Sequence, residues 1–189
     1  MKKLMLIVSL FLSVKIVTAQ NATQTLERDF LIYSKLITEK KIENALDYLN
    51  PKLFEIFPKE GMKKLMEAVY NMPNIQYKIS IPQILEIGDF RKINNIYYSK
   101  FKVLSFIEMR FEGVEKDENT ISAMIASFEA KFGKGNVQYD KSTEFFKINA
   151  TKEIVASSTD NQKNWKFITV DNAKMKMLIE KIIPKEILD

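Results

Sequence analysis

The residues best placed to do chemistry are carboxylates set inside apolar stretches. Glu86 and Asp89 lie in the segment Ile-Leu-Glu-Ile-Gly-Asp-Phe, and Glu108 lies in Phe-Ile-Glu-Met-Arg. A buried carboxylate has a raised pKa and exchanges protons near neutrality, so Asp89 and Glu108 are the candidate acid–base residues of an enzyme. Alternation along the strand places Glu108 beside Arg110, however, and an ordinary ion pair explains it more simply.

Hydroxyl groups on otherwise apolar strand faces form a second candidate site. Tyr77, Tyr97 and Phe101 fall on the same faces as Ser99 and Ser105. Apolar walls with a few polar groups are typical of ligand pockets, so these five residues are the candidate lining of a cavity. The alternative is an ordinary core in which the serine hydroxyls bond to backbone groups.

The composition excludes the common nucleophile and metal chemistries. The 189 residues include no histidine and no cysteine. Ser-His-Asp and Cys-His systems, the usual zinc sites, cysteine-ligated iron–sulfur clusters and disulfides all need one of these residues. Asp160 and Asn161 offer oxygen atoms but lack the spacing of an EF-hand loop. We therefore expect neither a metal ion nor another cofactor.

The first nineteen residues have the pattern of a bacterial signal peptide. A lysine pair precedes an apolar run over residues 4–14, and Val17 and Ala19 stand where signal peptidase reads small residues. The run is shorter than the ~20 residues that span a bilayer as a helix. We expect cleavage after Ala19 and a periplasmic or secreted protein without a membrane anchor.

Much of the apparent basicity of the chain resides in this leader. The full sequence carries 29 basic and 24 acidic residues, a formal charge of +5. Removing residues 1–19 discards three lysines and no acidic residue, which leaves +2. The chain has only three arginines, although guanidinium groups dominate the recognition of bases and phosphates. We therefore expect no nucleic-acid partner.

Hydrophobic periodicity predicts the elements that position these residues. Apolar residues three and four apart predict helices near residues 26–37, 42–49 and 59–71, and the period becomes two at Ile75. Strands are predicted over residues 75–81, 83–90, 96–112, 137–139, 144–149, 152–157 and 165–170, with a turn at 91–95. A helix over 117–132 ends at Gly133, and Asp171-Asn172 caps a last helix.

Short turns between successive strands indicate an antiparallel sheet. The sequence therefore predicts a single α+β domain over residues 20–189. In it, N-terminal helices pack on a bent antiparallel sheet that has an inserted helix and a C-terminal helix.

This order of elements resembles the cone-like fold of the nuclear transport factor two-like superfamily, which includes ketosteroid isomerase. The segments Asn136-Val-Gln-Tyr-Asp140, Lys152-Glu-Ile-Val-Ala156 and Asn164-Trp-Lys-Phe-Ile168 look like those of uncharacterised secreted Bacteroidota proteins of this shape. The resemblance covers most of residues 23–189, although the helix at 117–132 departs from the simplest form of the fold. No residue matches the isomerase's Asp base, Tyr and second carboxylic acid, so the resemblance implies no activity.

Three functions fit this sequence. The leading hypothesis is a non-enzymatic exported domain that binds a small apolar ligand or an envelope protein partner. A homodimer formed through the exposed sheet face is compatible with this hypothesis. The alternative is a cofactor-free isomerase, dehydratase or hydrolase that uses carboxylate and tyrosine acid–base chemistry inside the cone. A structural envelope protein is the third. A cavity of at least ~300 Å³ with a buried carboxylate near a tyrosine would favour the enzyme.

Overall fold

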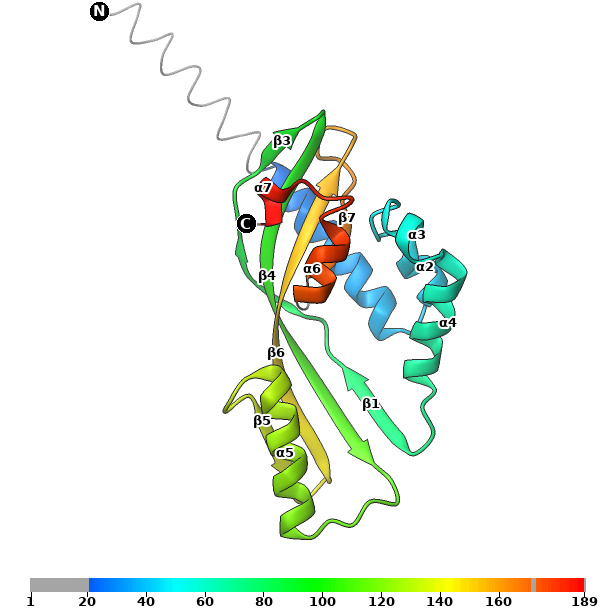
Figure 1. The fold of residues 1–189 in the computed structure, drawn as a ribbon, viewed down its shortest axis with the longest axis vertical. Helices are drawn as coiled ribbons and strands as arrows, with labels where there is room; N and C mark the ends of the chain where they lie inside the picture. The colour runs from blue at the N-terminus through cyan, green and yellow to red at the C-terminus, as the bar shows by residue number, and fades with distance from the viewer. Residues whose placement is uncertain (1–20, 171–172, 189) are drawn as a thin grey trace, which may run out of the picture.

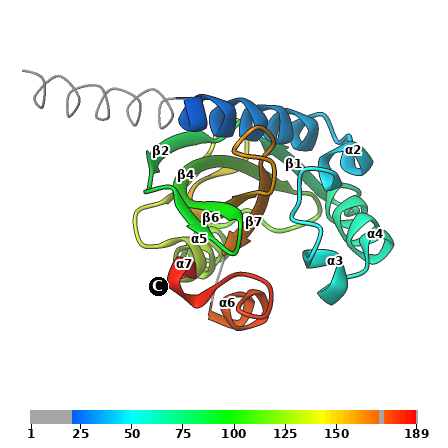
Figure 2. The same ribbon diagram turned by 90° about the horizontal axis from the view of Figure 1, so that it is seen from above.

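The computed structural model describes residues 21–170 and 173–188. Within them a seven-stranded antiparallel sheet carries helices on both sides, which is the α+β fold that the sequence predicts (Figure 1 and Figure 2). The predicted leader, its cleavage site and the predicted cap Asp171-Asn172 lie outside these residues. No helix in the described ranges is long and apolar enough to cross a bilayer.

The chain begins its described part with helices and continues into the sheet. The helical residues 21–38, here called the N-terminal helix, are followed by α2 (Ile42–Leu46), α3 (Leu53–Ile56) and α4 (Lys59–Tyr70). The next elements are β1 (Ile75–Ile79), β2 (Gln83–Ile87), β3 (Arg91–Ile93), β4 (Ile96–Phe111) and α5 (Glu118–Phe132). The last are β5 (Val137–Asp140), β6 (Phe145–Ser158), β7 (Lys166–Val170), α6 (Ala173–Ile179) and α7 (Lys185–Leu188).

Two long strands, β4 and β6, form the spine of the sheet. They pair in antiparallel register from Tyr97 with Ser158 to Met109 with Phe146. Strands β3, β2 and β1 pair in succession along the other edge of β4, and β7 and β5 do so along β6. Because side chains alternate along a strand, the odd positions of β4 and the even positions of β6 share one face, here called the inner face.

The inner face is buried by different helices at its two ends. Leu26 and Phe30 of the N-terminal helix cover one end, and α5 covers the other through Phe128, which contacts Phe111 and Phe146. Figure 2 shows these two helices on opposite sides of the spine. The inner face therefore points in opposite directions at the two ends of the spine, because the two strands are strongly twisted.

The opposite face of the sheet packs against helices at one end only. Tyr98, Val155 and Ile168 pack there in one core with residues of α2, α3, α6 and α7. Beyond this core the face is partly solvent-exposed, and Phe106 of β4 remains 40% exposed there.

Helix α5 has the ends that its sequence predicts. The Asp117 carboxylate accepts hydrogen bonds from the backbone N–H groups of Asn119 and Thr120, which no earlier carbonyl can satisfy. Gly133 follows the helix with φ 95, in the region that favours glycine.

Three local predictions are wrong. Residues 91–93 form strand β3 and not a turn, because Asn94 and Asn95 adopt positive φ and close a tight hairpin with β4. Residues 145–158 form one continuous strand, where the sequence predicts two. The last helix, which the sequence predicts to end at Pro184, already ends at Ile179 as α6, and a separate short helix, α7, follows Pro184.

Candidate functional site

A cavity of about 110 Å³ lies between the N-terminal helix and the middle of the inner face. Its walls come from that helix, from β1 and the loop after it, and from β4, β6 and β7. We call it the helix–sheet cavity. Its apolar wall includes Phe30, Ile37, Ile79, Val103, Ile107 and Ile154.

Aromatic side chains fill the inner face on one side of this cavity. The Phe101 ring packs edge-on against Phe30 and Phe167, with ring centroids 5.0 and 6.0 Å away. Phe101, Phe167 and Trp165 are each at most 1% exposed. The helix–sheet cavity begins where this aromatic packing ends.

Ser34 brings a hydroxyl group into the wall of the cavity. It follows Leu26 and Phe30 at four-residue intervals, on the side of the helix that faces the sheet. Ser34 is only 3% exposed, and its Oγ has no hydrogen-bond partner among the described residues. A buried hydroxyl without a partner costs about 1–3 kcal/mol, so its retention requires an explanation.

Ser105 and Lys152 interrupt the apolar inner face on the sheet side of the cavity. Ser105 pairs with Ala150, and Lys152 pairs with Val103 at the next position on the same face. Ser105 and Lys152 are thus diagonal neighbours on adjacent strands, roughly 7–8 Å apart at the backbone and within reach of a long side chain. Three polar residues, each breaking an otherwise apolar pattern, therefore meet around one cavity.

Of the five candidate lining residues, Tyr77 and Ser105 lie in the wall of the helix–sheet cavity. Burial raises the pKa of Tyr77, so its hydroxyl stays protonated and available as a donor. The Tyr77 ring packs edge-on against Tyr70 of α4, with centroids 6.0 Å apart. Tyr77 therefore connects the cavity wall to the helical layer behind it.

The other three candidates have different surroundings. The Ser99 hydroxyl donates a hydrogen bond to the Gly88 carbonyl, 3.0 Å away, and so acts as the ordinary core serine of the alternative interpretation. Phe101 belongs to the aromatic core. Tyr97 is half-buried at the far end of β4, with the Lys92 ammonium 4.9 Å from its ring centroid.

The two candidate acid–base residues lie outside the cavity. Glu108 is 3.5 Å from the Lys78 ammonium, which agrees with the simpler ion-pair interpretation. Asp89 is exposed and borders an open groove of about 340 Å³ that Ser99 and Phe101 also border. That groove is lined by charged groups of both signs, and no tyrosine occurs among its described lining residues.

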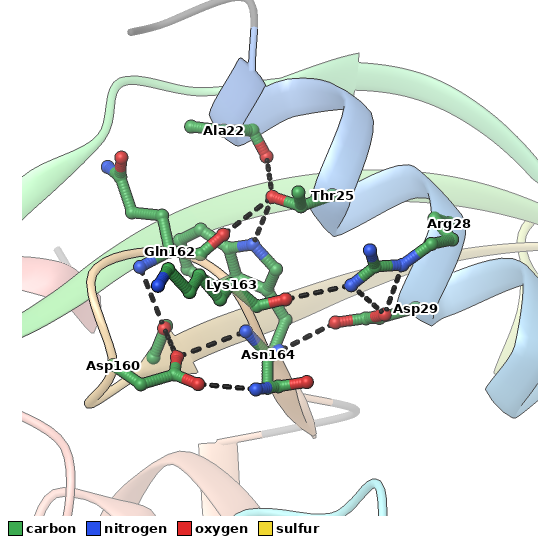
Figure 3. Close-up of polar contacts among 10 residues, drawn as sticks. Ala22, Thr25, Arg28, Asp29, Asp160, Gln162, Lys163 and Asn164 are labelled. Atoms are coloured by element: carbon green, nitrogen blue, oxygen red, sulfur yellow. Dashed lines mark hydrogen bonds and ion pairs between the residues drawn. The ribbon is translucent and has the colours of Figure 1, made fainter.

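A polar network fixes the N-terminal helix to the hairpin between β6 and β7, as Figure 3 shows. The Asp29 carboxylate, 4% exposed as a residue, accepts a hydrogen bond of 2.8 Å from the Trp165 backbone N–H. Arg28 contacts the same carboxylate and donates to the Lys163 carbonyl. The Trp165 indole N–H donates to the Thr25 hydroxyl. This network holds in place the helix that carries Ser34.

The carboxylate of Asp160 is used within the hairpin itself. It accepts hydrogen bonds from the Ser158 hydroxyl and from the backbone and side-chain nitrogens of Asn164 (Figure 3). These bonds hold the pKa of Asp160 below its usual range, at about 2, although burial opposes them. Across the residues described, no cluster of three acidic side chains could hold a metal ion.

No family model matches this chain, and no curated protein matches it. The assignment of the site therefore depends on its geometry. Ser34 and Lys152 are absent from the candidate residues that the sequence suggests, although the sequence contains a pattern that could have identified them. Each is a polar residue at an apolar position of its helix or strand.

Proposed function

We propose that this chain is an exported, non-enzymatic domain that binds a small, mostly apolar ligand in the helix–sheet cavity. The unpartnered hydroxyl of Ser34 carries the proposal. A ligand that accepts or donates one hydrogen bond there would remove the cost of burying this group. Hydroxyl groups of Ser105 and Tyr77 in the same wall offer further contacts.

The volume of the cavity limits the ligand to one ring or a short chain. An apolar cavity of about 150 Å³ accommodates benzene, and drug-sized ligands need about 300–1,000 Å³. At about 110 Å³, the helix–sheet cavity is smaller than the benzene cavity, so benzyl alcohol is an upper limit for the ligand and would extend partly out of the cavity. Its mixture of apolar walls and a few hydroxyl groups matches such an amphipathic molecule.

The enzymatic alternative has less support than ligand binding. Among the described residues, those that line the cavity include no aspartate and no glutamate, so the carboxylate base of that mechanism has no candidate there. Ser34 has no base beside it to activate its hydroxyl as a nucleophile. The cavity has the groups to hold a molecule but, among the described residues, no carboxylate to act as the base.

Titration with benzyl alcohol, followed by amide chemical shifts in NMR, tests this proposal. Saturable shifts centred on Ser34, Ser105 and Tyr77 are expected, because these residues surround the ligand. The Ser34→Leu variant fills the cavity and should abolish the shifts. The control Lys35→Leu, which places the same side chain on the exposed side of the same helix, should retain them. Shifts that are absent, or equal in both variants, would contradict the proposal.

The second candidate function is binding of a protein partner, and the exposed apolar residues of α4 and of the segment just after it support this function. Leu65 is 67% exposed and Met72, just after the helix, is 44% exposed. Exposed apolar groups that lie close together are typical of protein contacts. Cross-linking of the intact chain in its native envelope should capture a defined species that Leu65→Glu removes. An identical cross-linking pattern in the variant would exclude this surface.

A further inference from the structure

Lys152 occupies a position where the strand pattern calls for an apolar residue. It stands on the even-numbered side of β6, between Ala150 and Ile154, which are 2% and 4% exposed. Lysine is almost never placed among buried residues without a partner for its charge. The Lys152 side chain is half-buried and lines the helix–sheet cavity.

No carboxylate in the described part of the chain forms an ion pair with Lys152, although neighbouring lysines have partners. Lys100 is 3.7 Å from Glu153, and Lys102 is 3.2 Å from Glu86. These pairs belong to the other face of the sheet, because Glu153 alternates with Lys152 along β6. An anion that enters the cavity would therefore not have to displace a described carboxylate from the Lys152 ammonium group.

We infer that the ligand is a small monocarboxylic acid whose carboxylate binds the Lys152 ammonium and whose apolar body lies under the N-terminal helix. This inference rests on the proposed function and names the ligand class of the same cavity. The carboxylate forms a charge-assisted hydrogen bond with Lys152, and the hydroxyl of Ser105 lies on the neighbouring strand to donate another. The Ser34 hydroxyl requires a second polar atom of the ligand, because contact with the apolar body alone would leave it without a hydrogen bond.

A single carboxylate fits this site better than a phosphate. Lys152 is the one cationic side chain among the described lining residues, and no arginine lines the cavity. Phosphate recognition typically uses several donors, often including a guanidinium group or a helix N-terminus.

The test compares benzoate with benzyl alcohol at neutral pH, using the dissociation constants of the intact protein from the same NMR titration. These two probes share a ring and differ mainly in the charge of the polar group. Benzoate should bind about 10- to 100-fold more tightly than benzyl alcohol, because a hydrogen bond to a charged group is stronger than one between neutral groups. Lys152→Met should remove this preference, and Lys152→Arg should retain part of it.

Lys102→Met is the matched control, because it removes one charge at the adjacent position on the opposite face of the sheet. It should leave the preference for benzoate intact. Equal affinity of the wild-type protein for the two probes would overturn the carboxylate inference and leave the proposed function standing. Saturable binding of neither probe would overturn both. Equal loss of preference in the Lys102 and Lys152 variants would overturn a specific role for Lys152.

Discussion

Two serines with different surroundings show how a single residue distinguishes a site from a core. Ser99 and Ser34 are both at most 3% exposed. The Ser99 hydroxyl bonds to the Gly88 carbonyl, whereas the Ser34 hydroxyl finds no partner among the residues described. Ser99 therefore stabilises the fold, whereas the unpartnered hydroxyl of Ser34 in the cavity wall lowers the stability of the fold. Stability lost at a position that a ligand would satisfy is typical of functional sites.

Alanine substitution separates these two roles. Ser34→Ala should raise the free energy of unfolding by about 1 kcal/mol, because it removes an unsatisfied hydroxyl and adds a strong helix former. Ser99→Ala should lower it by about 1 kcal/mol, because it leaves a carbonyl acceptor without its hydroxyl donor. Urea denaturation of both variants measures the two changes. A loss of stability in Ser34→Ala comparable to that in Ser99→Ala would mean that the Ser34 hydroxyl has a partner.

At the scale of elements, the N-terminal helix connects the cavity to the rest of the fold. Its first turns are fixed to the β6–β7 hairpin through Thr25 and Asp29, and its later turns carry Ser34. The carboxylate of Asp29 satisfies the Trp165 backbone N–H between two layers of structure. The position of the cavity wall thus depends on contacts made one to three turns earlier in the same helix.

Asp29→Ala tests this connection. The substitution leaves the buried Trp165 N–H without an acceptor and should lower the free energy of unfolding by about 1–3 kcal/mol. Asp47→Ala is the control, because Asp47 pairs with Lys59 at a 63% exposed side chain and such pairs contribute at most about 1 kcal/mol. Chemical denaturation gives both values. Equal effects of the two substitutions would show that the Asp29 contact does not anchor the helix.

The contact between α4 and β1 predicts sensitivity to alkaline pH. Burial, with a smaller contribution from Tyr77, raises the pKa of Tyr70 from 10.0 to about 12. The folded state therefore holds the Tyr70 proton more tightly than the unfolded state. Stability is retained below pH 10 and falls as the pH rises from 10 toward 12. Tyr70→Phe should reduce this fall, as measured by unfolding at several pH values, and an unchanged pH profile would contradict the assignment.

The sequence predicts most elements but not how their faces meet. Alternation locates β1 and β4 well, because each buries one face. The sequence predicts a break at residues 150–151, between a strand that ends at Asn149 and one that begins at Lys152. In the structure the strand continues, and Lys152 faces the cavity. Ser34 and Lys152 are 118 positions apart, so only the folded chain brings them to one wall.

At the scale of the whole molecule, the inner face of the twisted spine is covered differently at its two ends. Near one end, Phe30, Phe101 and Phe167 interdigitate and leave no space for a ligand. Near the other end, α5 covers the same face of the sheet. The helix–sheet cavity lies between them, where the face turns from one covering helix to the other. Ser34, Ser105 and Lys152 are among the polar residues that line this gap.

The most direct measurement of the central claim is the location of bound benzoate, from nuclear Overhauser contacts between its ring protons and the protein. We predict contacts to Ile107 and Ile154 in the cavity wall and to the Cβ protons of Ser34. The same contacts should disappear in Ser34→Leu and persist in Lys35→Leu. Contacts confined to the exposed groove beside Asp89, or to the apolar surface of α4, would contradict binding in the helix–sheet cavity.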